Sequence, residues 1–96
     1  MRSYEQSIAC EPAGDRPFRF VWRARIWRVE SIERSWVETV PWWLGIHGGP
    51  PGSAVRTATR LVQRRLWRVE ASSGERRGVY DLACCEDAWA LVAAVD

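Results

Sequence analysis

Arginine and aromatic side chains are interleaved in one early segment of the chain. The set comprises Arg19, Arg23 and Arg28 together with Trp22 and Trp27. Single-stranded nucleic acid is often held by such a combination, because bases stack on aromatic rings while arginines contact the phosphates. The same rings are also good candidates for the hydrophobic core, and a buried ring cannot stack on a base. The pattern therefore predicts either a nucleic-acid-binding face or an aromatic core.

Arg64, Arg65 and Arg68 form a second basic group later in the chain. All 14 basic residues are arginine, and the formal net charge is only +2. The charge is uneven, since residues 16–28 and 51–77 are basic whereas the C-terminal stretch is acidic. If the two basic segments share a face, that face attracts anions. The alternative, which we favour, is that they lie against the acidic stretch and their charges cancel in ion pairs.

Residue types that carry catalysis or bind metals are few. His47 is the only histidine, and it lies in a segment rich in glycine and proline. Cys10, Cys84 and Cys85 have no spacing typical of a metal site, and adjacent cysteines on a strand point to opposite faces. The sequence contains no nucleophile-elbow, phosphate-binding-loop or dinucleotide-binding motif. We therefore expect a protein that is not an enzyme, with no metal and no cofactor.

Seven tryptophans in 96 residues are an unusually high density. Most are expected in the core, because a small domain needs large apolar groups to fill it. One or two are expected as exposed anchors for a partner protein, since tryptophan is frequent in interface hot spots. The candidates are Trp42 and Trp43, followed by Trp36. The alternative for Trp42 and Trp43 is a lid over the open end of a barrel.

The length and composition indicate one small globular domain. Hydrophobic residues make up 47% of the chain and charged residues 27%, which excludes wholesale disorder. There is no apolar run of about 18 residues that could cross a bilayer, and no apolar stretch typical of a signal peptide. We therefore expect a cytoplasmic protein without membrane contact.

The elements that position these side chains are predicted to be strands. From residue 18 onward, apolar and polar residues alternate with a period of two, which is typical of a half-buried strand. A turn at Arg23-Ala24 would complete a hairpin with one apolar face. That face comprises Phe18, Phe20, Trp22, Trp27 and Val29. After Val29 the apolar positions shift to Ile32 and Trp36, which predicts a β-bulge in the second strand.

The rest of the chain predicts a mainly β fold. Residues 1–16 are predicted to be a polar lead-in, and residues 17–96 a single β domain. Residues 44–60 are rich in glycine and proline, which predicts a long flexible loop, with a possible short helix beginning near Ser53. From residue 61 the alternation returns and predicts a three-stranded meander. Five to six antiparallel strands would then form a bent sheet or small barrel.

A short linear motif in the second basic group suggests one partner. Gln63-Arg64-Arg65-Leu66-Trp67 resembles the Q-x-x-L-F motif with which bacterial replication and repair proteins bind the sliding clamp. Such motifs normally lie on accessible tails, whereas Leu66 and Trp67 fall within a predicted strand.

Several blocks of the sequence resemble one family. The segments FRFVWRARIWRVESIERSW, VETVPWW, RRLWRVEASSGERRGVYDL and DAWALVAAVD are similar to a family of small actinobacterial domains of unknown function. The later part is also similar to the C-terminal region of the polymerase-like accessory subunit of the bacterial mutasome. That subunit is a catalytically inactive relative of Y-family DNA polymerases. The positions that carry this second likeness are Trp42, Trp43, Trp67, Gly74, Tyr80, Asp81 and Trp89.

The resemblance implies an interaction module that works near translesion synthesis and has no active site to transfer. Ala24 departs from the family pattern, which has glycine there, as do Cys84 and Cys85, where polar or aromatic residues are expected. The first expectation is thus a non-catalytic protein-interaction module in DNA repair, with a translesion polymerase subunit or the sliding clamp as partner. The alternative is a single-stranded nucleic-acid-binding domain that uses the Arg/Trp face.

Overall fold

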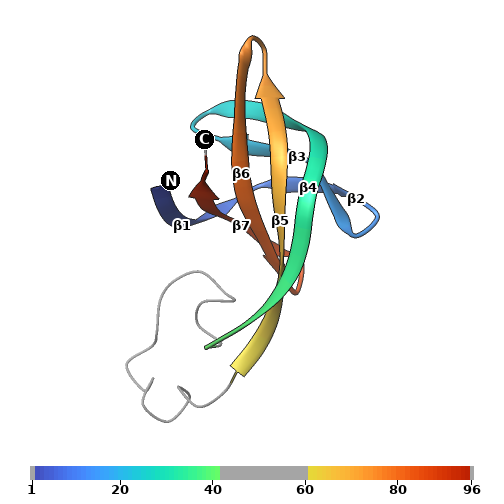
Figure 1. Ribbon diagram of the computed structural model, residues 1–96, viewed down its shortest axis with the longest axis vertical. Helices are drawn as coiled ribbons and strands as arrows, with labels where there is room; N and C mark the ends of the chain where they lie inside the picture. The colour runs from blue at the N-terminus through green and yellow to red at the C-terminus, as the bar shows by residue number, and fades with distance from the viewer. Residues whose placement is uncertain (1, 42–60, 96) are drawn as a thin grey trace.

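The computed structural model describes residues 2–41 and 61–95, which form one antiparallel sheet of seven strands (Figure 1). The strands are β1 (Arg2–Ile8), β2 (Cys10–Ala13), β3 (Arg16–Trp22), β4 (Arg25–Pro41), β5 (Leu61–Ser73), β6 (Arg76–Cys85) and β7 (Ala88–Ala94). The predicted mainly β fold, a bent antiparallel sheet, is confirmed. The possible helix near Ser53, the loop at 44–60 and His47 lie outside the described residues.

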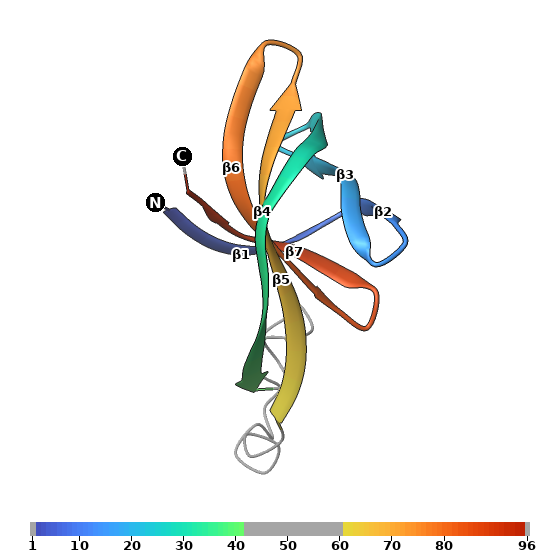
Figure 2. The ribbon, with the colours of Figure 1, turned by 45° about the vertical axis from the view of Figure 1, so that its right-hand side comes forward.

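The strand order, β1-β7-β6-β5-β4-β3-β2, places two consecutive strands at opposite edges of the sheet. Only Ala9 separates β1 from β2, so the sheet must curl until its edges meet. The Val21 amide donates a hydrogen bond of 2.9 Å to the Ala9 carbonyl, which joins β3 to this connection. The result is a half-barrel whose two longest strands, β4 and β5, extend beyond the curl (Figure 2).

The N-terminal residues differ from the predicted polar lead-in. Residues 2–8 form β1, which pairs with β7, and residues 10–13 form β2, which pairs with β3. Their side chains are mostly exposed because both are edge strands, so they lack the apolar alternation that identifies a half-buried strand. These two strands raise the number to seven, above the predicted five to six.

The predicted hairpin at Arg23-Ala24 is present as β3 and β4. Phe20 pairs with Trp27 and Trp22 pairs with Arg25, so the two central turn residues are those predicted. Phe18 was expected on the apolar face but is 41% exposed. The reason is a bulge: Arg19 pairs with Glu11 and Pro17 with the adjacent Pro12, so Phe18 is an extra residue.

Strand β4 contains the irregularity that the shifted apolar pattern predicts. Its pairing with β5 skips one residue between Val29 and Ser31 and another between Ile32 and Arg34. Each extra residue turns the strand and changes which side chains face the core. The meander of β5, β6 and β7 is confirmed as well.

Aromatic side chains fill the concave side of the sheet. The buried cluster contains Phe20, Trp22, Trp27, Trp67, Val69, Ala71, Tyr80, Leu82, Trp89 and Leu91. Trp67 and Trp89 stack with ring centroids 5.2 Å apart. Tyr4 on the edge strand β1 meets Trp22 on β3 edge-on at 4.9 Å, so side chains also join the two sides of the curled sheet. The interpretation of tryptophans as core residues is therefore correct for Trp22, Trp27, Trp67 and Trp89.

Candidate anion-binding pocket

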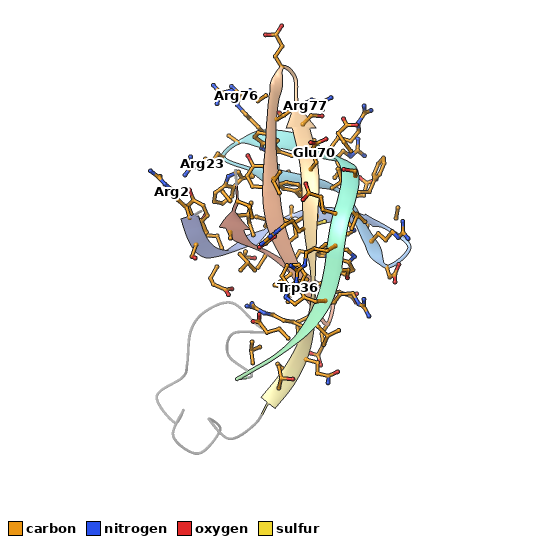
Figure 3. All side chains as sticks on the ribbon, in the orientation of Figure 1. Arg2, Arg23, Trp36, Glu70, Arg76 and Arg77 are labelled. Atoms are coloured by element: carbon orange, nitrogen blue, oxygen red, sulfur yellow. The ribbon has the colours of Figure 1, made fainter. Side chains whose placement is uncertain are left out.

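An open pocket of about 560 Å³ lies at one end of the half-barrel. The β3–β4 turn and the β5–β6 turn lie toward this end, because β4 begins close to where β5 ends and Arg28 pairs with Ser72. Figure 3 shows Arg23 and Arg76 on the same side of the molecule, with Arg77 near the tip of the β5–β6 hairpin. We call the lining residues the arginine pocket. They are Trp22, Arg23, Arg25, Trp27, Arg76, Arg77 and Tyr80.

The floor of the arginine pocket is aromatic and fixed by the core. Trp22, Trp27 and Tyr80 are 7%, 5% and 8% exposed, respectively. The Trp27 indole donates a hydrogen bond from Nε1 to the Trp22 carbonyl oxygen at 3.2 Å. The Trp27 and Tyr80 rings meet edge-on with centroids 5.2 Å apart. These rings present only a small part of their surface, so the floor cannot offer a full ring face to a base.

The rim of the pocket is strongly basic. Within the described residues, the exposed side chains of Arg23, Arg25 and Arg76 form no ion pair, and no carboxylate lines the pocket. Arg77 differs, since its Nη1 lies 3.5 Å from a Glu70 carboxylate oxygen. Three guanidinium groups are therefore available for an anionic ligand.

Arg23 is held in place by contacts with aromatic side chains. Its Nη2 donates a hydrogen bond to the Tyr4 hydroxyl at 2.9 Å. Its guanidinium carbon also lies 5.2 Å from the Trp22 ring centroid and 5.5 Å from that of Tyr4. These contacts leave the positive charge unneutralised, whereas an ion pair would cancel it.

The Tyr80 hydroxyl experiences the positive charges of two pocket arginines. Burial raises the pKa of Tyr80, while the positive charges of Arg23 and Arg76 act in the opposite direction. Both guanidiniums therefore lie within electrostatic range of one hydroxyl, although they come from different hairpins. A negatively charged group bound there would experience the same two charges.

The six arginines predicted as nucleic-acid candidates do not form one surface. Arg23 lines the pocket, whereas Arg65 lies in two pockets with Asp15 and Trp67. The other four form ion pairs within the described residues. The pairs are Arg19–Glu11 at 2.7 Å, Arg28–Glu30 at 3.6 Å, Arg68–Asp81 at 2.8 Å, and Arg64 with Glu5 and Glu38 at 2.7 and 2.8 Å. Charge cancellation therefore applies to these four, but only Arg68 pairs with the acidic C-terminal stretch, through Asp81. The carboxylates that pair with the other three arginines lie on β1, β2 and β4.

Three pocket arginines were missed by the sequence reasoning. Arg25 follows the β3–β4 turn directly, and Arg76 and Arg77 follow the β5–β6 turn. The available signal was an arginine immediately after a predicted turn, in two hairpins that form neighbouring parts of one sheet. The order of strands in that sheet, which the sequence does not contain explicitly, is what brings the two turns together.

The protein-interaction candidates are only partly within the described residues. Trp42 and Trp43 lie outside them. Trp36 is half-buried on β4, with the guanidinium carbons of Arg34 and Arg68 lying 4.6 and 5.9 Å from its ring centroid. Its pairing partner is Leu66, and both lie on the face opposite to the aromatic cluster.

The cysteines are poor nucleophiles in this environment. Burial raises the pKa of Cys10 to about 12, and it also raises the pKa values of Cys84 and Cys85. A thiol with such a pKa is protonated at neutral pH, and the thiolate is the reactive form. Within residues 2–41 and 61–95, no three metal-ligating side chains lie close enough together to hold an ion.

The comparison with protein families gives one match. A family model described as a domain of unknown function, DUF6504, matches residues 1–96. The chain belongs to the DUF6504 family. The expectation of an uncharacterised small-domain family is therefore confirmed. No curated protein and no solved structure matches this DUF6504 domain. Among its described residues, no helix has the length and apolar character needed to span a membrane.

Proposed function

We propose that this DUF6504 domain is a non-catalytic binding module of the cytoplasm whose ligand is single-stranded nucleic acid, held at the arginine pocket. The observation that carries the proposal is the contrast between two sets of arginines. Arg23, Arg25 and Arg76 surround one pocket without an ion pair among the described residues, whereas Arg19, Arg28, Arg64 and Arg68 are neutralised by carboxylates.

Phosphate is the group that such a pocket suits best. The planar guanidinium presents its donors as a fork that matches phosphate oxygens, and it keeps its charge at every physiological pH. The exposed rims of the floor rings add apolar contact for a sugar or a base edge. Because those rings belong to the core, phosphate contacts would contribute more of the affinity than base stacking does in proteins with open aromatic faces.

The test is binding of an internally fluorescein-labelled oligothymidylate of about twelve nucleotides, followed by anisotropy over a salt series. Three phosphate contacts predict a slope of about −2 on a log–log plot of affinity against salt, from about −0.7 per contact on single strands. The double variant Arg25→Gln/Arg76→Gln should lose most of the affinity and flatten the slope.

A matched control variant also loses two positive charges, but at positions outside the arginine pocket. Arg19→Gln/Arg28→Gln removes two exposed arginines that are already paired with carboxylates. It should bind almost as tightly as the wild-type protein. Equal losses in the two double variants would mean that only net charge matters. No binding of the wild-type protein at low salt would reject the proposal.

A second candidate function is the docking of a DNA-repair protein, and the observation that favours it is the position of Trp36. This ring is half-buried on the outer face, and it lies close to two guanidinium groups. The later part of the sequence resembles the C-terminal region of the mutasome subunit, and this resemblance favours a partner such as a translesion polymerase subunit or the sliding clamp.

Affinity capture from damaged host cells tests this second candidate. After nuclease treatment, retention of polymerase or clamp components should require Trp36 and should survive Val37→Ala, a change at a neighbouring exposed residue. Capture that disappears with nuclease would favour the nucleic-acid function instead.

A further inference from the structure

The arginine pocket is closed on its inner side by the core. Phe20 lies beneath it, with ring centroids 6.5 Å from Trp27 and 5.8 Å from Tyr80. Phe20 is 1% exposed, so these three rings form a continuous packed layer under the pocket. These packed rings prevent a bound group from reaching deeper into the half-barrel. A group that enters the pocket is therefore held between the aromatic floor and the arginines of the rim.

The charge in the pocket exceeds that of one phosphodiester. Arg23, Arg25 and Arg76 carry three positive charges without an ion pair among the described residues, and Arg77 adds a fourth that is shared with Glu70. A phosphodiester carries a single negative charge. A phosphate monoester carries about −1.5 to −2 at neutral pH and has three free acceptor oxygens. Its additional charge and oxygens match the additional guanidiniums.

We propose that the arginine pocket recognises the terminal phosphate monoester of a nucleic-acid strand. This inference rests on the proposed nucleic-acid function and specifies which part of the strand enters the pocket. Arg23, positioned by its hydrogen bond to Tyr4, approaches the phosphate from the β3–β4 turn. Arg76 approaches it from the β5–β6 hairpin, and the closed aromatic floor stops further entry.

A second pocket of the curled sheet differs from the arginine pocket in the charges of its lining residues. Its lining includes Arg65 but also Asp15 and Asp87. These carboxylates would repel an anion, so the contrast assigns the phosphate to the arginine pocket and makes Arg65 a useful control position.

The test compares strands of one sequence that differ only at their ends: a 5′-phosphate, a 3′-phosphate, or hydroxyl groups at both ends, each labelled internally. One or two additional charge-assisted hydrogen bonds predict that one phosphorylated end binds about ten- to a hundredfold more tightly than the hydroxyl-ended strand. Arg25→Gln/Arg76→Gln should remove this advantage. Arg65→Gln should keep it.

Each outcome separates the two proposals. Equal binding of all strands would overturn the terminal-phosphate inference and leave nucleic-acid binding intact, whereas no binding of any strand would overturn both. An advantage that survives Arg25→Gln/Arg76→Gln would place the phosphate elsewhere and reject the inference. Competition by a mononucleotide or inorganic phosphate, at the concentration where the phosphorylated strand competes, would reassign the site to a small phosphate ligand.

Discussion

Tyr80 lies directly over the backbone of Gly78. A Cβ atom at position 78 would lie 2.8 Å from the Tyr80 hydroxyl oxygen and 2.9 Å from its ring carbon Cε2. Residues two apart on a strand face the same way, so glycine at 78 provides the space that the tyrosine occupies. The floor of the arginine pocket therefore depends on the absence of a side chain two residues earlier.

Gly78→Ala should destabilise the fold by about 1–3 kcal/mol, because the added methyl group must displace a buried ring. Urea unfolding measures the free energy of unfolding. The cost should shrink in a Tyr80→Leu background, since leucine lacks the hydroxyl and the ring atoms that the methyl group meets. An unchanged cost in that background would assign the effect to the backbone of β6 rather than to Tyr80.

Ala24→Gly should stabilise the protein by about 0.5–1 kcal/mol. Arg23 and Ala24 have φ angles of 53° and 61°, so both central residues of the β3–β4 turn adopt the left-handed region. This turn type favours glycine, because a Cβ atom is strained there. Ala13→Gly is the control: Ala13 is a strand residue without a positive φ, so the same change should destabilise. Thermal or urea unfolding of both variants checks the opposite signs.

Arg64→Ala should destabilise more than Arg19→Ala, although each removes an arginine that forms an ion pair. The Arg64 side chain is 4% exposed and contacts Glu5 on β1 and Glu38 on β4. Its loss should cost about 1–3 kcal/mol, a value reduced because both carboxylates are partly exposed. The Arg19–Glu11 pair is exposed, so its loss should cost about 0–1 kcal/mol. Equal costs in urea unfolding would show that burial of Arg64 contributes little.

The stability of the fold should fall as the pH rises from about 9 toward 12, in part because of Cys10. Burial, with a smaller contribution from Cys84, raises the pKa of the Cys10 thiol from 9.0 to about 12 in the folded protein. Below pH 9 both states keep the proton, so the thiol has no effect on the pH dependence. Above pH 9 the unfolded chain loses this proton while the folded chain keeps it, which favours unfolding.

Cys10→Ala isolates this contribution from other groups that titrate in the same range. The free energy of unfolding should decline less steeply between pH 9 and 11 in the variant than in the wild-type protein. Parallel declines would show that the Cys10 thiol ionises equally in both states.

Much of the sheet was predictable because alternation is a local signal. Phe20, Trp22 and Trp27 alternate with polar neighbours, and the loss of phase after Val29 indicated a bulge. The edge strands β1 and β2 were missed, because an edge strand of a curled sheet needs no continuous apolar face. β1 is placed by its pairing with β7, which is distant in the sequence, and β2 is placed by its pairing with β3. The mostly polar residues of these two edge strands give no sign of either pairing.

The candidate site was predictable only in its residue types. Arginine near aromatic rings was the right combination, but Arg23 alone among the six candidates lines the pocket within the described chain. Arg64 and Arg68 were attractive candidates because they lie in a basic segment. Their carboxylate partners, Glu5 and Asp81, come from other strands and become visible only when the strands are placed.

The pairing of β1 with β7 has a consequence for how the chain folds during synthesis. Arg2 pairs with Ala94, so the hydrogen bonds between β1 and β7 can form only after β7 has been synthesised. Loop-closure entropy makes such long-range pairing slow. The β5–β6–β7 meander can form early from local contacts, but it exposes the free edge of β7 until β1 arrives. Completion of the sheet therefore follows the synthesis of β7, and the interval before it is when the unpaired β7 edge is most prone to aggregation.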